Sequence, residues 1–305
     1  MSDASTPVGP PHDLEVGPAT VDERGAVIDL FASGQVEPTR HIAYLSLGTE
    51  PIAAELTALE PGGWDDVVVA RRDGLVIGAL AAEHDREPPR VWWHGPAVVD
   101  RDDVDFLDVA GALLEAGRAR LPAHVTEEEL AGDDRHVELT ALASRYGFDT
   151  APASAVLSRA CTPPPVAPEV AAIRPFTESD RPVVAAIHDA TFPNNHQPGH
   201  RVDEGTDRTV LVAERDGHVA GYAAVERHED GSGYLDLVGV DPASRGAGVG
   251  AALVVAALVH LGALGCEVAN LTVRETNAVA RRLYERLGFT EERLVRPHRR
   301  GFHLP

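Results

Sequence analysis

Lysine is absent from this chain, so its 27 basic residues are all arginines, and 48 aspartates and glutamates outnumber them. Without lysine there can be no Schiff-base lysine, no P-loop and no kinase lysine. The formal net charge of −21 disfavours nucleic acid, whose binding depends on basic residues that neutralise phosphates. A field of this sign instead attracts cationic small molecules such as amines.

Cysteines and long apolar runs are also scarce. The two cysteines, Cys161 and Cys266, are too few for a disulfide framework or a cysteine-based zinc site, so we expect free thiols and no metal. No stretch reaches the roughly 18 apolar residues of a membrane span. The start of the chain lacks the basic flank and apolar core of a signal peptide. We therefore expect a cytoplasmic protein that does not bind membranes.

Prolines indicate where the chain divides. Four of them fall within 161–168, and such a segment can run neither as a helix nor as a central strand. We predict a linker over 161–170 between two domains, 21–160 and 171–305. Residues 1–20 are rich in proline and glycine, and we predict a disordered tail there.

The two predicted domains are related in sequence. Residues 65–83 and 208–226 are identical at 10 of 19 positions, and both carry Arg-Asp-Gly between β-branched runs, which is typical of a hairpin turn. Farther on, ASRYGF ends at Phe148 and YERLGF ends at Phe289, at nearly the same offset. This similarity indicates a duplicated domain.

The pattern of the second half predicts a mixed α/β fold. We expect a strand at 173–176, a helix at 179–191 capped by Ser179, a hairpin at 208–226 and a strand at 234–240. A glycine-rich turn and a buried helix to about 264 follow, then a strand at 268–273, a helix between Asn277 and Gly288, and a last strand. Antiparallel strands thus come first and a strand–helix–strand crossover later.

Gly246, Gly248 and Gly250 lie in the turn before the buried helix. Glycines let the backbone approach a ligand, and the N–H groups of a first helical turn attract phosphate, so we expect a phosphorylated cofactor here. Residues 246–251 also satisfy the dinucleotide fingerprint, with Glu275 as the ribose acid. However, five residues separate the strand from the first glycine, and only 54 residues follow the fingerprint. A role of the glycines in packing alone is a further alternative.

The second half resembles the GCN5-related N-acetyltransferase (GNAT) family from Ile173 to beyond Phe289. Two motifs carry the resemblance: Arg245-Gly-Ala-Gly248-Val-Gly250, which is similar to the family's acyl-CoA loop, and Asn277-x-x-Ala280-x-x-Leu283-Tyr284-x-x-x-Gly288-Phe289, its second signature. The resemblance implies an enzyme that transfers an acetyl group from acetyl-CoA to a primary amine of a small molecule or peptide by direct attack. An acyl-CoA-binding sensor or partner-docking pseudoenzyme is the alternative.

The resemblance also implies roles for single residues. The pyrophosphate would bind the backbone N–H groups of Arg245, Gly246, Ala247, Gly248, Val249 and Gly250. The pantetheine arm would pair with the strand at Val238, Gly239 and Val240, and Asn277 would touch the cofactor. Tyr284 would protonate the departing thiolate, and Asp236 is the candidate base. Two residues before Asp236, where several relatives carry a basic glutamate, this chain has Tyr234.

The first half resembles the same family but lacks these groups. In place of the glycine turn it has four carboxylates, which would cap a helix but repel a pyrophosphate: Asp102, Asp103, Asp105 and Asp108. His136 takes the place of Asn277, and Ala143 that of Tyr284. We therefore expect tandem domains of which only the C-terminal one binds acyl-CoA, in a monomer or a homodimer.

Overall fold

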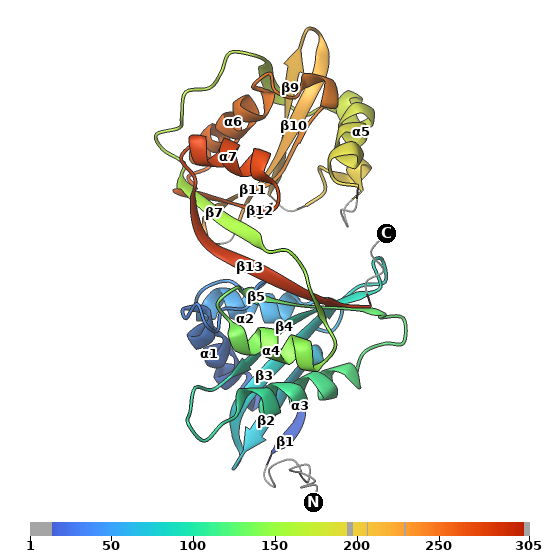
Figure 1. Cartoon of the computed structure of the whole chain (residues 1–305), viewed down its shortest axis with the longest axis vertical. Helices are drawn as coiled ribbons and strands as arrows, with labels where there is room; N and C mark the ends of the chain where they lie inside the picture. Colours follow the sequence, from blue (N-terminus) through green and yellow to red (C-terminus); the bar gives the residue numbers. More distant parts are fainter. Residues whose placement is uncertain (1–13, 194–197, 206, 229, 302–305) are drawn as a thin grey trace, which may run out of the picture. The chain divides into compact units, whose positions relative to one another are not determined.

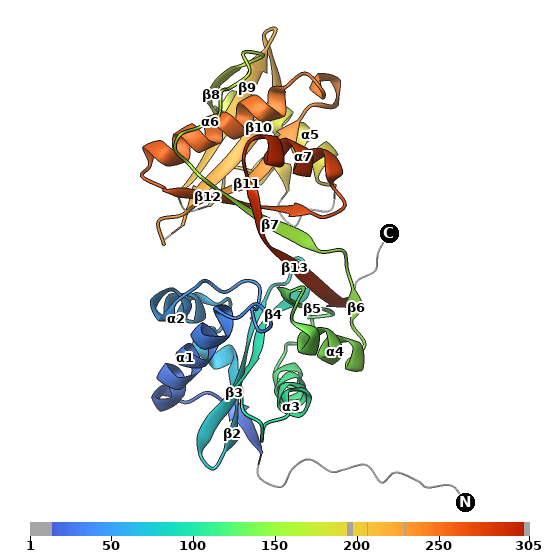
Figure 2. The ribbon, with the colours of Figure 1, turned by 60° about the vertical axis from the view of Figure 1, so that its left-hand side comes forward.

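The computed structural model describes residues 14–193, 198–205, 207–228 and 230–301. The chain forms two compact units: unit 1 comprises Met1–Ala153 with Val295–Pro305, and unit 2 comprises Ser154–Leu294. Each unit is a mixed sheet with helices on both faces, which confirms the predicted α/β class (Figures 1 and 2). No helix in the described part of the chain is long and apolar enough to cross a membrane.

Unit 2 is built on seven neighbouring strands. Their order is β8 (Ala172–Pro175), β9 (Arg208–Arg215), β10 (His218–Arg227), β11 (Gly233–Val240), β12 (Val268–Arg274), β7 (Ser154–Ala160) and the start of β13 (Thr290–Arg300). β11 and β12 are parallel, whereas β8 to β11 and the pair β12–β7 are antiparallel. α5 (Arg181–Thr191) packs on one face, and α6 (Val249–Ala263) and α7 (Ala278–Arg286) pack on the other (Figure 1).

Local sequence explains several of these boundaries. The predicted hairpin is present, because Asp216 and Gly217 adopt the positive φ angles (52° and 75°) that a two-residue hairpin turn needs. α7 begins after Asn277, whose side chain accepts a hydrogen bond from the Ala280 N–H (3.2 Å), as predicted. The prediction of Ser179 as the cap of α5 is wrong. Thr177 caps a 3-10 turn there, Glu178–Asp180, that leads into the helix.

Unit 1 repeats this plan. Its strand order is β1 (Glu15–Pro18), β2 (Val67–Arg72), β3 (Leu75–His84), β4 (Arg90–Val98), β5 (Glu127–Asp133) and the end of β13, with β6 (Asp149–Thr150) also pairing with β13. α1 (Arg24–Gln35) and α2 (Thr49–Ala58) cover one face, and α3 (Phe106–Arg118) and α4 (Val137–Arg145) the other. The prediction of disorder over 1–20 is wrong for Glu15–Pro18, because these residues pair with β2 and Val16 packs on the core.

The compact units do not divide at the proline-rich segment. β7 precedes that segment in the chain, yet it pairs with β12 along seven residues within unit 2. Conversely, Val295–Arg300 of β13 pair with β5 within unit 1. The first half of the sequence therefore contributes β7 to unit 2, and the second half contributes the end of β13 to unit 1. The units divide before Ser154 and before Val295, not at the predicted segment 161–170.

Candidate functional site

The parallel strands of unit 2 separate along their length. β11 and β12 pair only at Gly233–Ala269 and Tyr234–Asn270, although β11 continues along β10 to Val240 and β12 continues along β7 to Arg274. The N–H of Asp241 bonds to Ala220 on the β10 side (3.0 Å), so by alternation the N–H and C=O groups of Val238 and Val240 point toward the separated edge. An extended ligand can pair there as an additional strand.

A β-bulge lies at the start of this separation. Ala224 pairs with Leu237 and Val225 with Leu235, so Asp236 has no partner in the ladder. As a result Leu235 packs beneath α6, whereas Leu237 packs beneath α5. Two strand positions later, Gly239 allows the ring of Tyr222 to lie against the backbone, because a Cβ there would collide with that ring.

The glycine turn forms an uncapped helix N-terminus. Gly246 and Gly248 have φ angles of 78° and 87°, and Gly248 is the N-cap of α6 without any side-chain cap bond. The helical ladder starts with the Ala252 N–H, which bonds to the Gly248 carbonyl (3.1 Å), so the N–H groups of 249–251 have no helical acceptor. Together with the dipole of the 15-residue helix α6, these donors fit an anionic group such as a diphosphate.

Two neighbouring segments support this turn. A Cβ at Gly248 would lie 3.5 Å from Val170, so the end of the proline-rich segment backs the turn. A Cβ at Gly250 would lie 3.5 Å from Leu283 of α7. The N-cap of α7, Asn277, is exposed, and its oxygen is used in the cap bond while its amide N–H groups remain available to a ligand. Arg245 donates to the Val240 carbonyl (3.3 Å), which ties the turn to the end of β11.

Tyr234 lies where the strands begin to separate, and it interacts electrostatically with Tyr284 of α7. Tyr284 is 9% exposed on α7, and its ring meets Phe289 edge-on at 5.7 Å. Burial raises the pKa of Tyr284 to about 12, with a smaller contribution from Tyr234. Tyr234 occupies the last paired position of β11, and burial raises its pKa as well. Tyr284 is therefore a neutral phenol near neutral pH.

Asp236 is not isolated. Its Oδ2 accepts a hydrogen bond from Nη2 of Arg208 at 2.7 Å, and Arg208 also pairs with Glu226. Neither Arg208 nor Glu226 was predicted from the sequence as a site residue. The identity of Glu226 with Glu83 in the duplicated hairpin was a signal that could have pointed to Glu226.

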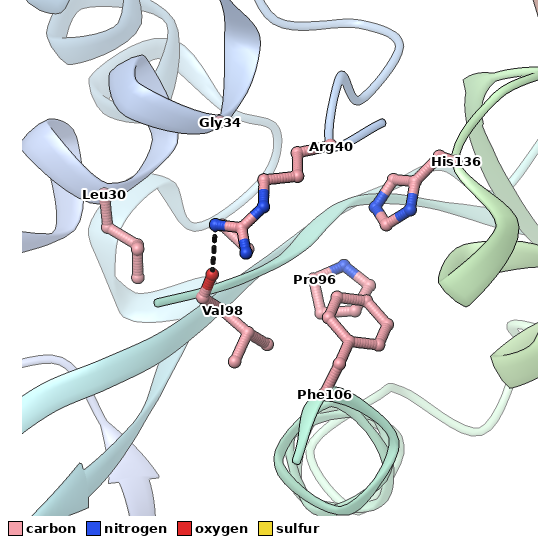
Figure 3. Close-up of a pocket in the computed structure, with 8 residues that line it drawn as sticks. Leu30, Gly34, Arg40, Pro96, Val98, Phe106 and His136 are labelled. Atoms are coloured by element: carbon pink, nitrogen blue, oxygen red, sulfur yellow. Dashed lines mark hydrogen bonds between the residues drawn. The ribbon is translucent and has the colours of Figure 1, made fainter. Parts of the chain in front are cut away.

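The corresponding strands of unit 1 also separate, but the space is filled. β4 and β5 pair from Arg90–Glu127 to Trp93–Leu130 only. Figure 3 shows Arg40 reaching the Val98 carbonyl at the end of β4 (3.5 Å), with Phe106 and His136 nearby. Arg40 also pairs with Asp100 (2.8 Å). The hollow that remains is about 10 Å³, room for a single water.

In unit 1 the N-termini of α3 and α4, the counterparts of α6 and α7, are capped by side chains. Asp105 accepts a hydrogen bond from the Asp108 N–H (3.0 Å) at the start of α3, which confirms the predicted capping by this carboxylate cluster. His136 caps α4 through its Nδ1, which accepts from the Leu139 N–H at 3.3 Å, and burial lowers its pKa to about 4. The unit thus has no counterpart of the uncapped glycine turn at α3.

Comparison with known proteins gives one consistent family. The pattern of the "Acetyltransferase (GNAT) family" matches residues 177–289. A mycothiol acetyltransferase of Actinosynnema mirum is 29% identical over 301 residues, which cover 94% of this chain and 87% of that protein. The mycothiol acetyltransferase of Saccharopolyspora erythraea is 31% identical over 210 residues, covering 59% of this chain and 68% of that protein.

Solved structures share the fold. A GCN5-related N-acetyltransferase from Sphaerobacter thermophilus superposes with a TM-score of 0.73 at 18% identity, covering 96% of both chains. A tandem GNAT protein from the clavulanic acid biosynthesis pathway superposes with a TM-score of 0.62 at 16% identity, covering 96% of this chain and all of that one.

Proposed function

Because the chain belongs to the GNAT family as a tandem-domain N-acetyltransferase, we propose that unit 2 transfers an acetyl group from acetyl-CoA to a primary amine of a small molecule or peptide, in the cytoplasm. The observation that carries the proposal is the uncapped glycine turn of α6 beside the separated edges of β11 and β12. These two features supply donors for a diphosphate and a strand edge for an extended arm.

Binding uses backbone groups above all. The diphosphate accepts hydrogen bonds from the N–H groups of the turn 245–250, where the helix dipole adds to the attraction. The pantetheine arm pairs with the edge formed by Val238, Gly239 and Val240, and Asn277 contacts the arm with its free amide group. This placement brings the thioester to the bulge at Asp236, near Tyr234 and Tyr284.

Chemistry proceeds by direct attack of the amine. Its nitrogen forms a bond to the thioester carbonyl carbon, and the electron pair that moves to oxygen is stabilised by the N–H of Val238. The C–S bond then breaks, and the thiolate takes the phenolic proton of Tyr284, which solvent replaces. The proton released by the amine passes to Asp236, directly or through water.

We propose an amine acceptor, and the names of the relatives indicate which amine to test first. Several relatives are named mycothiol acetyltransferases, so the acceptor of those enzymes is the first amine to test. Tyr234 stands where the resemblance places a basic glutamate in several relatives, and this difference argues for testing other primary amines alongside it.

Calorimetry with acetyl-CoA tests the binding step. Wild type should bind saturably, and Gly248→Asp should lose binding at least tenfold, because the residue is strained at φ 87° and adds a negative charge at the turn that would hold the diphosphate. Gly217→Asp is the matched control: its φ of 75° imposes the same strain at an open hairpin turn. No binding by wild type, or equal loss in both variants, would contradict the proposal.

A further inference from the structure

Arg208 is the most enclosed charged side chain near the bulge. Its side chain is only 4% exposed, yet its polar contacts join different segments of unit 2. Nε donates to the Val202 carbonyl (2.7 Å), Nη2 donates to Asp236 Oδ2 (2.7 Å), and Nη1 donates to Glu226 Oε1. One guanidinium therefore connects β9, β10, β11 and the segment that follows α5.

The strand register explains why these groups meet. Arg208 is the direct partner of Glu226 across β9 and β10, and Glu226 is the partner of Tyr234 across β10 and β11. Asp236 lies at the bulge two residues beyond Tyr234, where the ladder gives it no partner. Arg208 therefore binds the Asp236 carboxylate at a position where the ladder gives this residue no partner.

Arg208 and its two carboxylate partners differ in how far they are exposed. Arg208 is enclosed, whereas the side chains of Glu226 and Asp236 remain 26% and 30% exposed. Each carboxylate uses one oxygen to bind Arg208. The other oxygens, Oε2 of Glu226 and Oδ1 of Asp236, have no hydrogen-bond partner within the described residues, so they are available to a bound molecule.

The third contact reaches the segment after α5. Val202 is fully buried in the core beneath α5, and it follows the short turn Gly199–Arg201. The Gly199 N–H bonds to Asp189 of α5 (3.1 Å), so this segment is anchored at both ends. Arg208 thus holds the segment and the Asp236 carboxylate in one fixed relation.

We propose that Arg208 is a positioning residue for acetyl transfer, which fixes the Asp236 carboxylate at the bulge so that its free oxygen faces the attacking amine. The inference rests on the proposed function. A planar fork that donates to three acceptors at once is specific to arginine, because a lysine ammonium is a point charge on a flexible stem. Replacement by lysine therefore keeps the charge and removes the geometry.

The test compares Arg208→Lys with Arg174→Lys. Arg174 is a matched control, because it also bridges two carboxylates in unit 2, Asp180 (2.6 Å) and Glu214 (3.0 Å). Arg208→Lys should lower kcat for an amine acceptor at least tenfold, with Kd for acetyl-CoA within twofold of wild type. Arg174→Lys should change neither.

A double-mutant cycle separates positioning from general structural damage. If Arg208 acts through Asp236, adding Arg208→Lys to Asp236→Asn should lower kcat by less than twofold further. Equal losses in the two backgrounds, or no loss in the single variant, would overturn the proposal. If Arg208→Lys fails to fold, Glu226→Gln replaces it, with a smaller loss expected that also vanishes in Asp236→Asn.

The activity of the wild type distinguishes a failure of this inference from a failure of the proposed function. A wild type that binds acetyl-CoA but acetylates no amine would overturn both. An active wild type with an unaffected Arg208→Lys would overturn the role of Arg208 alone.

Discussion

A phenol with a pKa of about 12 is protonated throughout the neutral range, and burial of Tyr284, whose ring packs against Phe289, raises its pKa to this value. Tyr284→Phe should therefore lower kcat by about a hundredfold, the usual scale of general acid catalysis, while the Kd for acetyl-CoA stays the same. Because Tyr284 keeps its proton until the pH nears 12, wild-type kcat should show no alkaline fall from this group below about pH 11.

Steady-state kinetics with calorimetry checks this prediction. Tyr146→Phe is the control, since Tyr146 bonds to Glu115 on the surface of unit 1 (3.3 Å) and should leave kcat unchanged. Equal, negligible effects of Tyr284→Phe on turnover and affinity would remove the acid role and leave Tyr284 as a core aromatic.

Some site residues could be predicted from the sequence and others could not. Gly248 and Tyr284 stand in short motifs, because the turn and the helix that need them are local. Arg208 was missed, since its partners Glu226 and Asp236 lie 18 and 28 residues away and meet it only through strand pairing and a bulge. No pattern of neighbouring residues in the sequence predicts that these three side chains are in contact.

At the scale of elements, α6 and α3 occupy corresponding places in the two units, but only the N-terminus of α6 suits an anion. α6 starts at a left-handed glycine with free N–H groups, whereas α3 starts at Asp105, whose carboxylate occupies an N–H of its first turn. In addition, Arg40, Phe106 and His136 line a hollow of only about 10 Å³ where β4 leaves β5. We therefore expect unit 1 to repel a diphosphate and to leave no room for an extended arm.

One acetyl-CoA per chain is the expected stoichiometry. Calorimetry of wild type should fit a single site, and Gly248→Asp should weaken that one site at least tenfold, because the proposed site lies at the N-terminus of α6. Two sites, or a second site that keeps its affinity in the variant, would show that unit 1 binds the ligand despite Asp105 and Arg40.

The order of helices and strands could be predicted from the sequence, because hairpin turns and helix caps depend on adjacent residues such as Asp216-Gly217 and Asn277. Which strands belong to which unit could not be predicted. β7 and β13 read as the last strands of their own halves, and only their pairing partners, β12 and β5, reveal the exchange. Pairing between strands far apart in sequence leaves no local signal.

At the scale of the whole molecule, the exchange of strands makes the halves of the sequence interdependent. Glu128 and Glu129 of β5 are 7% and 3% exposed, and β13 supplies Arg300 and Arg299 to them (2.5 and 2.8 Å). A fragment that ends at residue 160 lacks these arginines. It also lacks the ladder that pairs Val295–Arg300 with β5. Glu128 keeps Arg118 (2.8 Å) in such a fragment, but Glu129 loses Arg299. Leaving a carboxylate of the sheet without its partner is destabilising.

A protease site inserted after Val166, which is exposed, tests this interdependence. After cleavage the two halves should still elute together under native conditions, because β7 remains in the sheet of unit 2 and β13 in that of unit 1. Residues 1–160 expressed alone should show no cooperative unfolding, and adding residues 161–305 should restore it. Halves that separate after cleavage and each unfold cooperatively would instead mean that β7 and β13 are dispensable, and that each half of the duplication folds by itself.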